Sequence, residues 1–439
     1  MPSPRRRLLA LAAAAVLTVA AAPAPAVASA GEPSYRPVIF VHGSAGSAAQ
    51  FETQAKRLTG NGYPIEVIEA HEYDSANIAT ILTQVHAGLD ARITRLLAAT
   101  GADRVDLVGH SLGTFVAQGY LTSSPARAAR VAHYVNLDGR TAAALPGGVP
   151  TLAIWGEGDP ARSIAGGTNV YLPDQSHTQT VSSAESFREI FRFLRGHGPA
   201  TTRIVPERGG PARVSGRAVI FPANTGVGDA TLEVYPVSRI TGRRLSPRPQ
   251  HVVPLSGDGS FGPLPVFPSV RYEFALLRTG TATHHFYLPP FVRSDSFVRL
   301  LAGRPGEGLG ALIETSDRHT ALVFSRQKEW WGDQGDAGDR LWINGRNILN
   351  PANAPRTKRV IGIFAFDDGS DGVTDLTAPL PEFFSQIFIT GMDVFIPATP
   401  AHHGVVSIAV HQRGGGFEVA GVPNWRSSDH RVTVNIDDH

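Results

Sequence analysis

Short apolar runs alternate with helix-length amphipathic stretches over residues 36–198, and this alternation is what most constrains the fold. In the stretch from about residue 77 to 99, apolar side chains recur at offsets of three, four and seven, which keeps one helix face apolar. The runs between such stretches are almost continuously apolar, as in parallel strands that helices cover on both faces. These runs are residues 37–41, 65–70, 104–108, 131–137, 151–155 and 169–172, and a last helix is expected over 184–194. The sequence therefore predicts an α/β domain built on a mostly parallel sheet.

The pattern changes after about Pro199, where glycine, proline and β-branched residues dominate and amphipathic helices disappear. Short strand-like runs are separated by turn clusters such as Ser256-Gly257-Asp258-Gly259. Regularly spaced short strands with turn signals indicate an all-β region of the sandwich or barrel type. We place an inner boundary near Pro289-Pro290, which predicts a β-sandwich-like domain over 199–290 and a second β-rich domain over 291–439.

The first 30 residues have the composition of a secretory signal peptide. Arginines at positions 5–7 precede an apolar stretch, and the segment closes on the small residues 28–30. The apolar stretch is interrupted by Pro23 and Pro25 and is shorter than the roughly 20 residues that a membrane span needs. We expect cleavage after Ala30, by the general or the twin-arginine export route, and hence a secreted, extracellular protein whose first domain covers residues 31–198.

Composition excludes several classes of function. The chain has no cysteine, which excludes disulfides, thiolate chemistry and cysteine-ligated metals. Three of its 40 basic residues lie in the leader, which leaves 37 basic against 38 acidic side chains in the mature chain. A near-neutral protein of this kind gives no case for nucleic acid binding.

The strongest motif is Gly109-His110-Ser111-Leu112-Gly113, which directly follows the apolar run 104–108 and directly precedes an apolar helix. A serine on such a tight strand-to-helix turn is held in a strained backbone conformation that projects its hydroxyl above the sheet. Side chains two residues before and after it would collide, so both positions are glycine. In this context the motif predicts the nucleophile elbow of an α/β hydrolase, with Ser111 as nucleophile.

A second feature supports this interpretation. The buried run 38–41 ends in His42-Gly43-Ser44, at the place where this fold takes one of its oxyanion donors. We expect the backbone N–H groups of Ser44 and Leu112 to bind the oxyanion of the tetrahedral intermediate. His42 itself is interpreted as a structural loop residue.

The general base is expected after the nucleophile in the chain, in the loop that follows the last strand. His177 fits this position, because it follows the run 169–172 and precedes the last helix. Two aspartates could orient it. Asp138 follows the strand 131–137, Asp159 follows the strand 151–155, and both lie just beyond carboxyl ends of strands. The general pattern of this fold favours Asp159.

A family resemblance favours the other aspartate. The segments around Gly109 to Asp138, His42 to Ser47 and Thr168 to His177 resemble archaeal two-domain lipases, which join a hydrolase domain to a C-terminal β-barrel. The resemblance covers most of residues 36–197 and fades in the β-rich half. It implies a triad of Ser111, His177 and Asp138, with Asp159 as the alternative acid.

One departure concerns substrate size. The lipases that the chain resembles carry a long helical lid insertion before the strand of the nucleophile, whereas here a single helix fills that interval. Because a lid covers an apolar acyl channel, its loss puts long-chain triglyceride specificity and interfacial activation in doubt.

The β-rich half offers fewer signals. Its aromatic residues are interpreted mainly as core, with Trp330-Trp331 as the better candidate for a lipid- or polymer-binding surface, since the pair precedes a polar loop. The loops 333–339 and 367–372 have oxygen-rich spacing that could hold Ca²⁺, but neither matches a full EF-hand loop. Apart from that Ca²⁺ candidate, no cofactor and no bound metal is expected.

These observations predict a secreted serine carboxylic ester hydrolase of the lipase or esterase type, which forms an acyl-enzyme and acts on small-molecule or lipid esters. Two alternatives remain at this point. One is an extracellular polyester or plant-polymer esterase whose β-rich half binds the polymer. The other is a non-catalytic surface-binding protein with a vestigial hydrolase domain.

Overall fold

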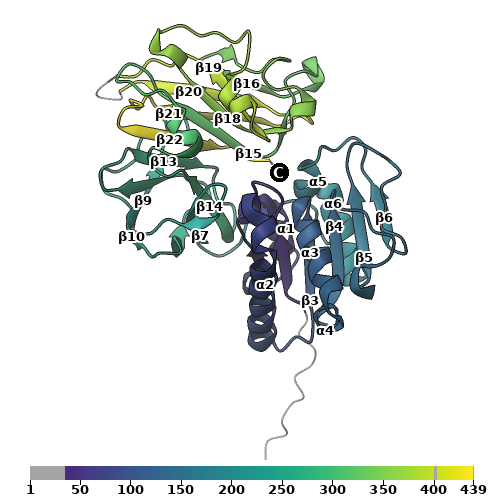
Figure 1. Ribbon diagram of the computed structural model, residues 1–439. Helices are drawn as coiled ribbons and strands as arrows, with labels where there is room; N and C mark the ends of the chain where they lie inside the picture. The colour runs from purple at the N-terminus through teal and green to yellow at the C-terminus, as the bar shows by residue number, and fades with distance from the viewer. Residues whose placement is uncertain (1–34, 400–402, 439) are drawn as a thin grey trace, which may run out of the picture.

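The computed structural model describes residues 35–399 and 403–438. The expected signal peptide, residues 1–30, lies outside this part of the chain. Two regions differ in architecture: an N-terminal domain (residues 35–198) of helices around a sheet, and a C-terminal β half (residues 199–438) whose regular secondary structure is mainly strands (Figure 1). This division into an α/β and an all-β region confirms the fold class predicted from the sequence.

A parallel sheet of six strands forms the centre of the N-terminal domain, in the order β2-β1-β3-β4-β5-β6. Every strand predicted in this domain is present within a few residues of its expected bounds. The strands are β1 Val38–Val41, β2 Ile68–His71, β3 Val105–His110, β4 Val131–Leu137, β5 Thr151–Trp155 and β6 Thr168–Tyr171. Because all six are parallel, their carboxyl ends meet along one edge, where the loops after β1, β3, β4, β5 and β6 come together.

Helices cover both faces of this sheet. They are α1 Glu52–Gly60, α2 Ile78–Thr100, α3 Leu112–Ser123, α4 Pro125–Ala128, α5 Gln179–Ser182 and α6 Ala184–Arg195. One buried cluster joins the sheet to α1 and α6 through residues such as Leu58 and Phe187, and another joins it to α2 and α3 through Leu89 and Tyr120. In the described residues, α2 is the only helix of eight or more residues between β2 and β3, so this interval holds no helical lid. No helix in the described ranges is both long and apolar enough to span a membrane.

The β half contains one long sheet and two short ones. The long sheet has eight strands in the order β10-β9-β12-β13-β22-β15-β18-β19, and the short sheets run β11-β7-β14, with β8 paired to β7, and β17-β16-β20-β21. The bounds are β7 Ala212–Ile220, β8 Thr225–Gly226, β9 Ala230–Val237, β10 His251–Leu255, β11 Ser260–Val266, β12 Arg271–Arg278, β13 Thr283–Leu288, β14 Asp295–Ala302, β15 Leu322–Trp330, β16 Arg340–Ile343, β17 Arg346–Asn347, β18 Val360–Phe366, β19 Ile389–Asp393, β20 Val405–His411, β21 Phe417–Pro423 and β22 His430–Asn435. A short helix, α7 Pro381–Phe384, precedes β19.

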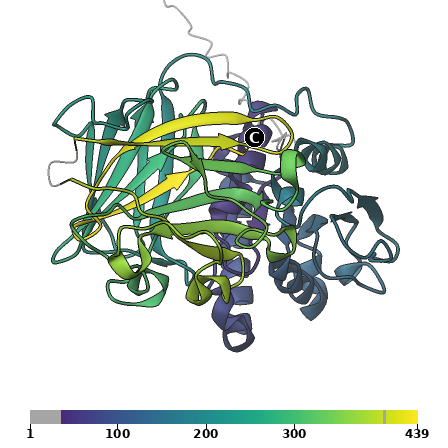
Figure 2. The same cartoon turned by 90° about the horizontal axis from the view of Figure 1, so that it is seen from above.

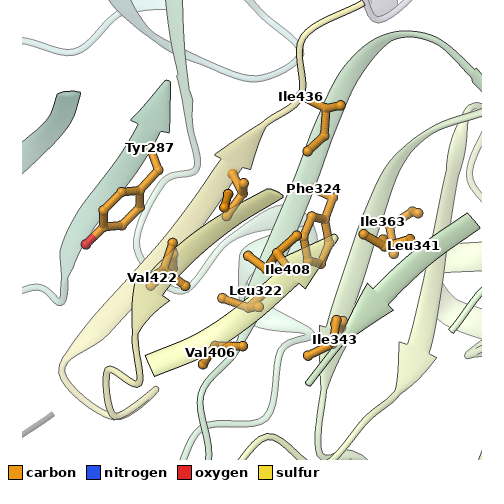
Figure 3. Close-up of a cluster of buried hydrophobic side chains, with 14 of the residues drawn as sticks. Tyr287, Leu322, Phe324, Leu341, Ile343, Ile363, Val406, Ile408, Val422 and Ile436 are labelled. Atoms are coloured by element: carbon orange, nitrogen blue, oxygen red, sulfur yellow. The ribbon is translucent and has the colours of Figure 1, made fainter. Parts of the chain in front are cut away.

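Each short sheet packs against a different part of the long one. Residues such as Leu232, Phe274 and Leu300 form a core between the long sheet and the sheet of β7, β11 and β14. A second core lies between β15, β18 and β22 of the long sheet and the strands β16, β20 and β21, where Phe324, Ile363 and Ile408 point toward one another (Figure 3). The view from above shows the long strands of this half running side by side next to the N-terminal domain (Figure 2).

The long sheet continues across the inner boundary expected near residue 290. The strand β13 lies before that point and β22 near the end of the chain, and the two pair in parallel. The strand β14 lies beyond it and pairs with β7. The domain boundaries of the β half stay a prediction, but the two cores share one continuous sheet.

The Trp330-Trp331 pair is not a surface feature, contrary to the candidate role expected for it. Trp330 is fully buried in the second core, and only 8 % of Trp331 is exposed. The ring of Trp331 lies between two guanidinium groups, with Arg356 at 3.9 Å and Arg413 at 4.0 Å from the ring centroid. Cation–π contact and burial therefore account for this tryptophan.

A buried carboxylate joins the N-terminal domain to the β half. Glu72, just after β2, forms ion pairs with Arg217 of β7 at 3.0 Å and Arg299 of β14 at 2.8 Å, and it accepts the Ala48 N–H at 2.9 Å. Burial alone would raise the pKa of Glu72, but the charges of Arg299 and Arg217 and the Ala48 N–H outweigh it and lower this pKa to about 2. Beside this cluster lies a cavity of about 430 Å³, which these three charged residues help to line.

The pKa of Glu72 predicts part of the acid sensitivity of the protein. Its ordinary value is 4.5 and the folded value about 2, so its contribution is present above pH 4.5 and is lost as the pH falls toward 2. This difference corresponds to about 3 kcal/mol of unfolding free energy. We expect Glu72→Gln to destabilise the protein by up to that amount at pH 6 and hardly at all near pH 2. Denaturant unfolding of both proteins across this range checks the prediction, and parallel stability curves would contradict it.

Candidate active site

The turn between β3 and α3 has the strained geometry that the sequence motif predicts. Ser111 has φ 50° and ψ −120°, a conformation that non-glycine residues rarely adopt, and it immediately precedes α3. The two flanking glycines are sterically required. A Cβ on Gly113 would lie 2.2 Å from the Val41 carbonyl oxygen, and one on Gly109 would lie 2.9 Å from the Gly113 carbonyl oxygen. The strain at Ser111 is therefore maintained by close packing of the turn against β1.

The structure brings His177 and Asp138 together. His177 lies in the loop after β6, Asp138 directly follows β4, and the His177 Nδ1–Asp138 Oδ2 distance is 2.6 Å. Both side chains are buried. Asp138 also accepts the Gly156 N–H at 2.8 Å and an Arg162 N–H at 2.9 Å, both at Oδ1. These four residues belong to three different loops at the carboxyl edge of the sheet.

The charge of Asp138 determines which ring nitrogen of His177 donates a proton to it. Burial alone would raise the pKa of Asp138, but the hydrogen bond and charge of His177, the Gly156 N–H and Arg162 together lower it. An ionised carboxylate can only accept hydrogen bonds, so Nδ1 of His177 donates the proton. In the tautomer with its proton on Nδ1, the lone pair of the ring lies on Nε2, which is the arrangement that a general base requires.

Asp159 is not brought to His177. It is exposed, and its carboxylate accepts the Ala161 N–H at 2.8 Å, while its carbonyl oxygen accepts from Arg162 Nε at 3.1 Å. Asp159 thus helps to hold the arginine that contacts Asp138. Of the two aspartates left open by the sequence, only Asp138 has the geometry of a partner for His177.

His177 also lies close to the elbow. Its ring centroid is 4.6 Å from that of His110, the residue before Ser111, and its carbonyl oxygen accepts a hydrogen bond from His110 Nε2 at 3.1 Å. Burial, followed by the charge of His177, lowers the pKa of His110 well below its ordinary value. His110 is therefore neutral and lies between the Ser111 turn and the histidine loop.

The loop after β1 lies directly against Ser111. A Cβ on Gly43 would lie 3.0 Å from the Ser111 Cβ, so the backbone of this loop passes close to the serine side chain. Ser44 follows Gly43, and Leu112 is the first residue of α3, whose N–H groups point out of the helix start. Both residues are half-buried. The two expected donors thus belong to segments that adjoin Ser111.

The remaining histidines of the domain have structural partners. His42 is buried, donates Nδ1–H to the Gly43 carbonyl oxygen at 2.8 Å, accepts the Tyr73 N–H at 3.2 Å and stacks on the Tyr73 ring. Burial lowers its pKa, in keeping with a neutral loop residue. His133 bonds Asp106 at 2.8 Å, and His197 lies exposed beyond α6.

Side chains of the β half, among them Phe388, Glu329 and Arg413, reach the histidine loop. The Phe388 ring lies nearly parallel to the His177 ring, with centroids 6.3 Å apart, and Phe388 itself has φ 65°. Glu329 accepts hydrogen bonds from Ser176 and Thr178, on both sides of His177. Sequence reasoning did not predict these contacts, because none of the three positions carries a local motif for them and each is more than 150 residues away from the loop that it contacts.

In each loop considered for Ca²⁺, one acidic side chain has a partner within the protein. Asp339 is buried in ion pairs with Arg326 and Arg413, and Asp367 accepts the Gly372 N–H within its own turn. In residues 35–399 and 403–438, no group of three or more His, Asp or Glu side chains is arranged to hold a metal ion.

Family models match three consecutive segments of the chain. Residues 35–130 match the model described as Lipase (class 2), and residues 210–305 match the Lipase C-terminal domain. A third model, of a C-terminal domain, matches residues 308–439. The first match contains Ser111 and the loop of Ser44, whereas Asp138 and His177 lie beyond its end. No curated protein matches the chain.

Solved structures similar to the chain align over little more than a third of it. A CIB-like hydrolase from Thermoplasma acidophilum is 17% identical, over 37% of this chain and 87% of its own, with a TM-score of 0.28. Aspergillus fumigatus lipase B is 15% identical, over 40% of this chain and 56% of its own, with a TM-score of 0.31. Est1E from Butyrivibrio proteoclasticus is 12% identical, over 38% and 90%, with a TM-score of 0.28. The chain is therefore similar to class 2 lipases over residues 35–130 and to a lipase C-terminal domain over residues 210–305.

Proposed function

We propose that this protein is a secreted serine carboxylic ester hydrolase that acts through Ser111, His177 and Asp138 and forms an acyl-enzyme. The observation that carries the proposal is the 2.6 Å bond between His177 and Asp138 next to the strained Ser111 turn. A buried acid, an imidazole and a serine on an elbow, in the chain order Ser, Asp, His, form the catalytic arrangement of α/β hydrolases.

Acylation follows from this arrangement. The Ser111 Oγ attacks the ester carbonyl carbon while its proton passes to Nε2 of His177. Asp138 stabilises the imidazolium that forms, and the N–H groups of Ser44 and Leu112 bind the oxyanion. When the intermediate collapses, the C–O bond to the alcohol breaks, and His177 gives its proton to the departing alkoxide.

Deacylation repeats these steps with water as nucleophile. His177 takes a proton from the water molecule, whose oxygen attacks the acyl carbon, and then returns a proton to Ser111 as the acid product leaves. Neither half-reaction needs a metal or an organic cofactor, so the proposal includes none.

The proposed substrates are small-molecule or lipid esters. The class 2 lipase match supports this substrate class, and apolar side chains such as Leu112 and Phe388 lie beside Ser111 and His177. The polymer-esterase alternative loses its main support, because Trp330 and Trp331 are buried. Secretion rests on the signal-like composition of residues 1–30.

Labelling with a fluorophosphonate tests the proposal directly, because this probe reacts only with a serine that a neighbouring base activates. We expect one modified peptide, containing Ser111, and turnover of soluble p-nitrophenyl esters by the same preparation. An acyl-chain series on these esters, with a pull-down on insoluble polyester, separates a lipase from a polymer esterase. A folded protein with an unmodified Ser111 and no turnover would instead support the vestigial, non-catalytic alternative.

A further inference from the structure

The loop that carries His177 is held by one carboxylate of the β half. Glu329, near the end of β15, is fully buried. Its Oε1 accepts the Thr178 N–H at 2.8 Å, and its Oε2 accepts the Thr178 hydroxyl at 2.7 Å and the Ser176 hydroxyl. These donors belong to the residues directly before and directly after His177, so the carboxylate holds the histidine loop on both sides of the histidine.

A second side chain of the β half supports the same loop. Arg413, just after β20, donates to the Ser176 hydroxyl oxygen at 3.2 Å and to Gln179 Oε1 at 3.0 Å. It also donates to the backbone carbonyl oxygen of Glu329. Arg413 thus contacts both the histidine loop and the strand that carries the carboxylate.

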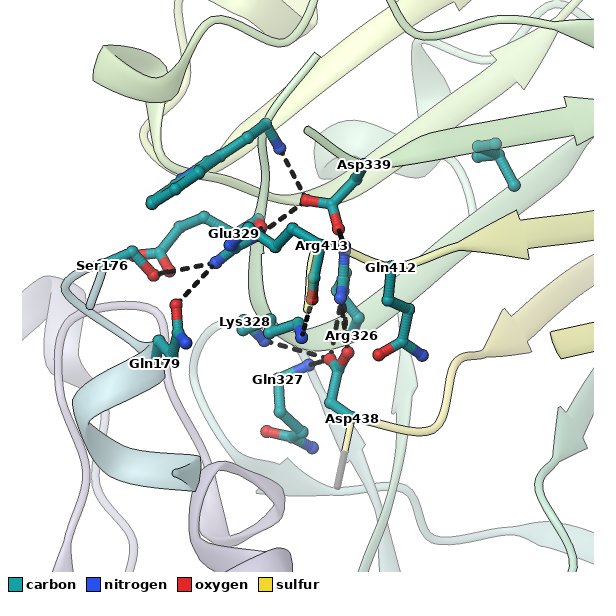
Figure 4. Close-up of polar contacts among 12 residues, drawn as sticks. Ser176, Gln179, Arg326, Gln327, Lys328, Glu329, Asp339, Gln412, Arg413 and Asp438 are labelled. Carbon is teal, nitrogen blue, oxygen red and sulfur yellow. Dashed lines mark hydrogen bonds and ion pairs between the residues drawn. The ribbon is translucent and has the colours of Figure 1, made fainter. Parts of the chain in front are cut away.

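The position of Arg413 is fixed in turn by a buried acidic residue. Asp339 forms an ion pair with Arg413 at 2.6 Å and also accepts its backbone N–H at 2.9 Å. Arg326 links Asp339, at 3.2 Å, to Asp438 near the end of the chain, at 2.6 Å (Figure 4). The network therefore ties the end of the chain, β15 and β20 to a loop of the N-terminal domain.

The chemistry of the contact between Glu329 and the histidine loop indicates a role beyond filling the interface between the domains. Burying a carboxylate is costly unless its oxygens are fully hydrogen-bonded, and apolar residues would seal a domain interface at a lower cost. Hydrogen bonds to a charged acceptor are also short and directional. Ser111 and His177 lie on separate loops, so their alignment depends on how firmly each loop is held. An error of about 1 Å in such an alignment can reduce a rate about 10²-fold.

We propose that Glu329 is a positioning residue for His177, so that the β half completes the catalytic apparatus of the N-terminal domain. The inference rests on the proposed function of Ser111, His177 and Asp138. Glu329 touches neither the substrate nor the reacting atoms in this proposal. It acts through Ser176 and Thr178, which set the backbone, and hence the ring, of His177.

Three variants test the role kinetically. Glu329→Leu removes all acceptors, Glu329→Gln keeps the shape and one acceptor oxygen, and Asp295→Asn is the matched control. Asp295 is also buried at the interface between the domains, where it pairs with Lys56 at 3.1 Å and has no contact with the histidine loop. On a short p-nitrophenyl ester we expect kcat to fall about 10²-fold in Glu329→Leu and about tenfold in Glu329→Gln, with KM within about twofold of the parent. Asp295→Asn should keep the parent kcat.

Nuclear magnetic resonance of ¹⁵N-histidine-labelled protein supplies a readout that does not depend on activity. The Nδ1 proton of His177, shared with Asp138, should give a low-field signal that disappears in His177→Ala. We expect this signal in the parent and in Asp295→Asn, and expect rapid solvent exchange to broaden it in Glu329→Leu and weaken it in Glu329→Gln. If Glu329→Leu does not fold, the Glu329→Gln protein decides by the same two measurements.

The outcomes of these experiments distinguish the positioning role of Glu329 from the proposed hydrolase function. Parent activity that is lost in Ser111→Ala, together with Glu329 variants that match Asp295→Asn in kcat and in the His177 signal, would overturn the positioning role and leave the proposed function intact. A parent protein without esterase activity would overturn the proposed function. In that case the His177 signal alone decides whether Glu329 holds the loop.

Discussion

Ser111→Ala is expected to lower kcat for p-nitrophenyl ester hydrolysis by up to about 10⁶-fold, if the three residues act as one unit. The variant loses the atom that bonds to the acyl carbon, and the remaining oxyanion donors can only assist attack by water. The change should be local, because the Ser111 backbone is held by the packing of Gly109 and Gly113 rather than by the serine hydroxyl.

Kinetics and folding must be measured on the same preparations. Ser407→Ala, at an exposed serine of β20, is the matched control and should keep the parent rate and melting temperature. Ser111→Ala should unfold at about the parent temperature or slightly above it, since alanine removes a polar group from a strained turn. Undiminished turnover in Ser111→Ala would show that the nucleophile lies elsewhere.

Asp138→Asn is expected to lower kcat about 10⁴-fold, the size of the corresponding change in a serine protease triad. An asparagine amide would donate toward Nδ1 and favour the tautomer that carries its proton on Nε2, which cannot accept the proton of Ser111. The substitution also affects two further hydrogen bonds, because Asp138 accepts the Gly156 N–H and an Arg162 N–H.

Asp159→Asn is the natural comparison, since the sequence alone left both aspartates open. Asp159 is exposed and bonded within its own turn, so we expect its substitution to change kcat by no more than about twofold. Measuring kcat, KM and the pH profile of both variants side by side decides between them. A crippled Asp159→Asn with an active Asp138→Asn would reverse the assignment of the acid.

Much of the fold could be predicted because it follows from local patterns of apolar residues in the sequence. Apolar offsets of three and four residues mark α2 and α6, and continuous apolar runs mark the strands of the parallel sheet, since burial on one or both faces dictates these periods. The turn that carries Ser111 could be predicted from the sequence equally well. Its two glycines are required by contacts of the turn with itself and with β1, which recur wherever a serine occupies this turn.

Other features depended on contacts between distant segments. Both aspartates follow strands of the same sheet, and only the paths of the two loops place Asp138 next to His177 and leave Asp159 in solvent. The tryptophans at 330 and 331 resemble a surface pair in the sequence, but the second core and two arginines enclose them.

The sequence by itself determined the parallel sheet, the strained serine and the order of the proposed nucleophile and base, because each follows from neighbouring residues and their spacing. Only the tertiary structure decided which carboxylate bonds to the imidazole and that one long sheet contributes to both β cores. It also decided that Glu329 accepts hydrogen bonds from the histidine loop. These outcomes involve partners from about 40 to more than 150 residues apart in the chain, as with Asp138 and His177 or Thr178 and Glu329. No local period encodes such pairings, because they arise only when separate segments pack together and buried polar groups must find acceptors.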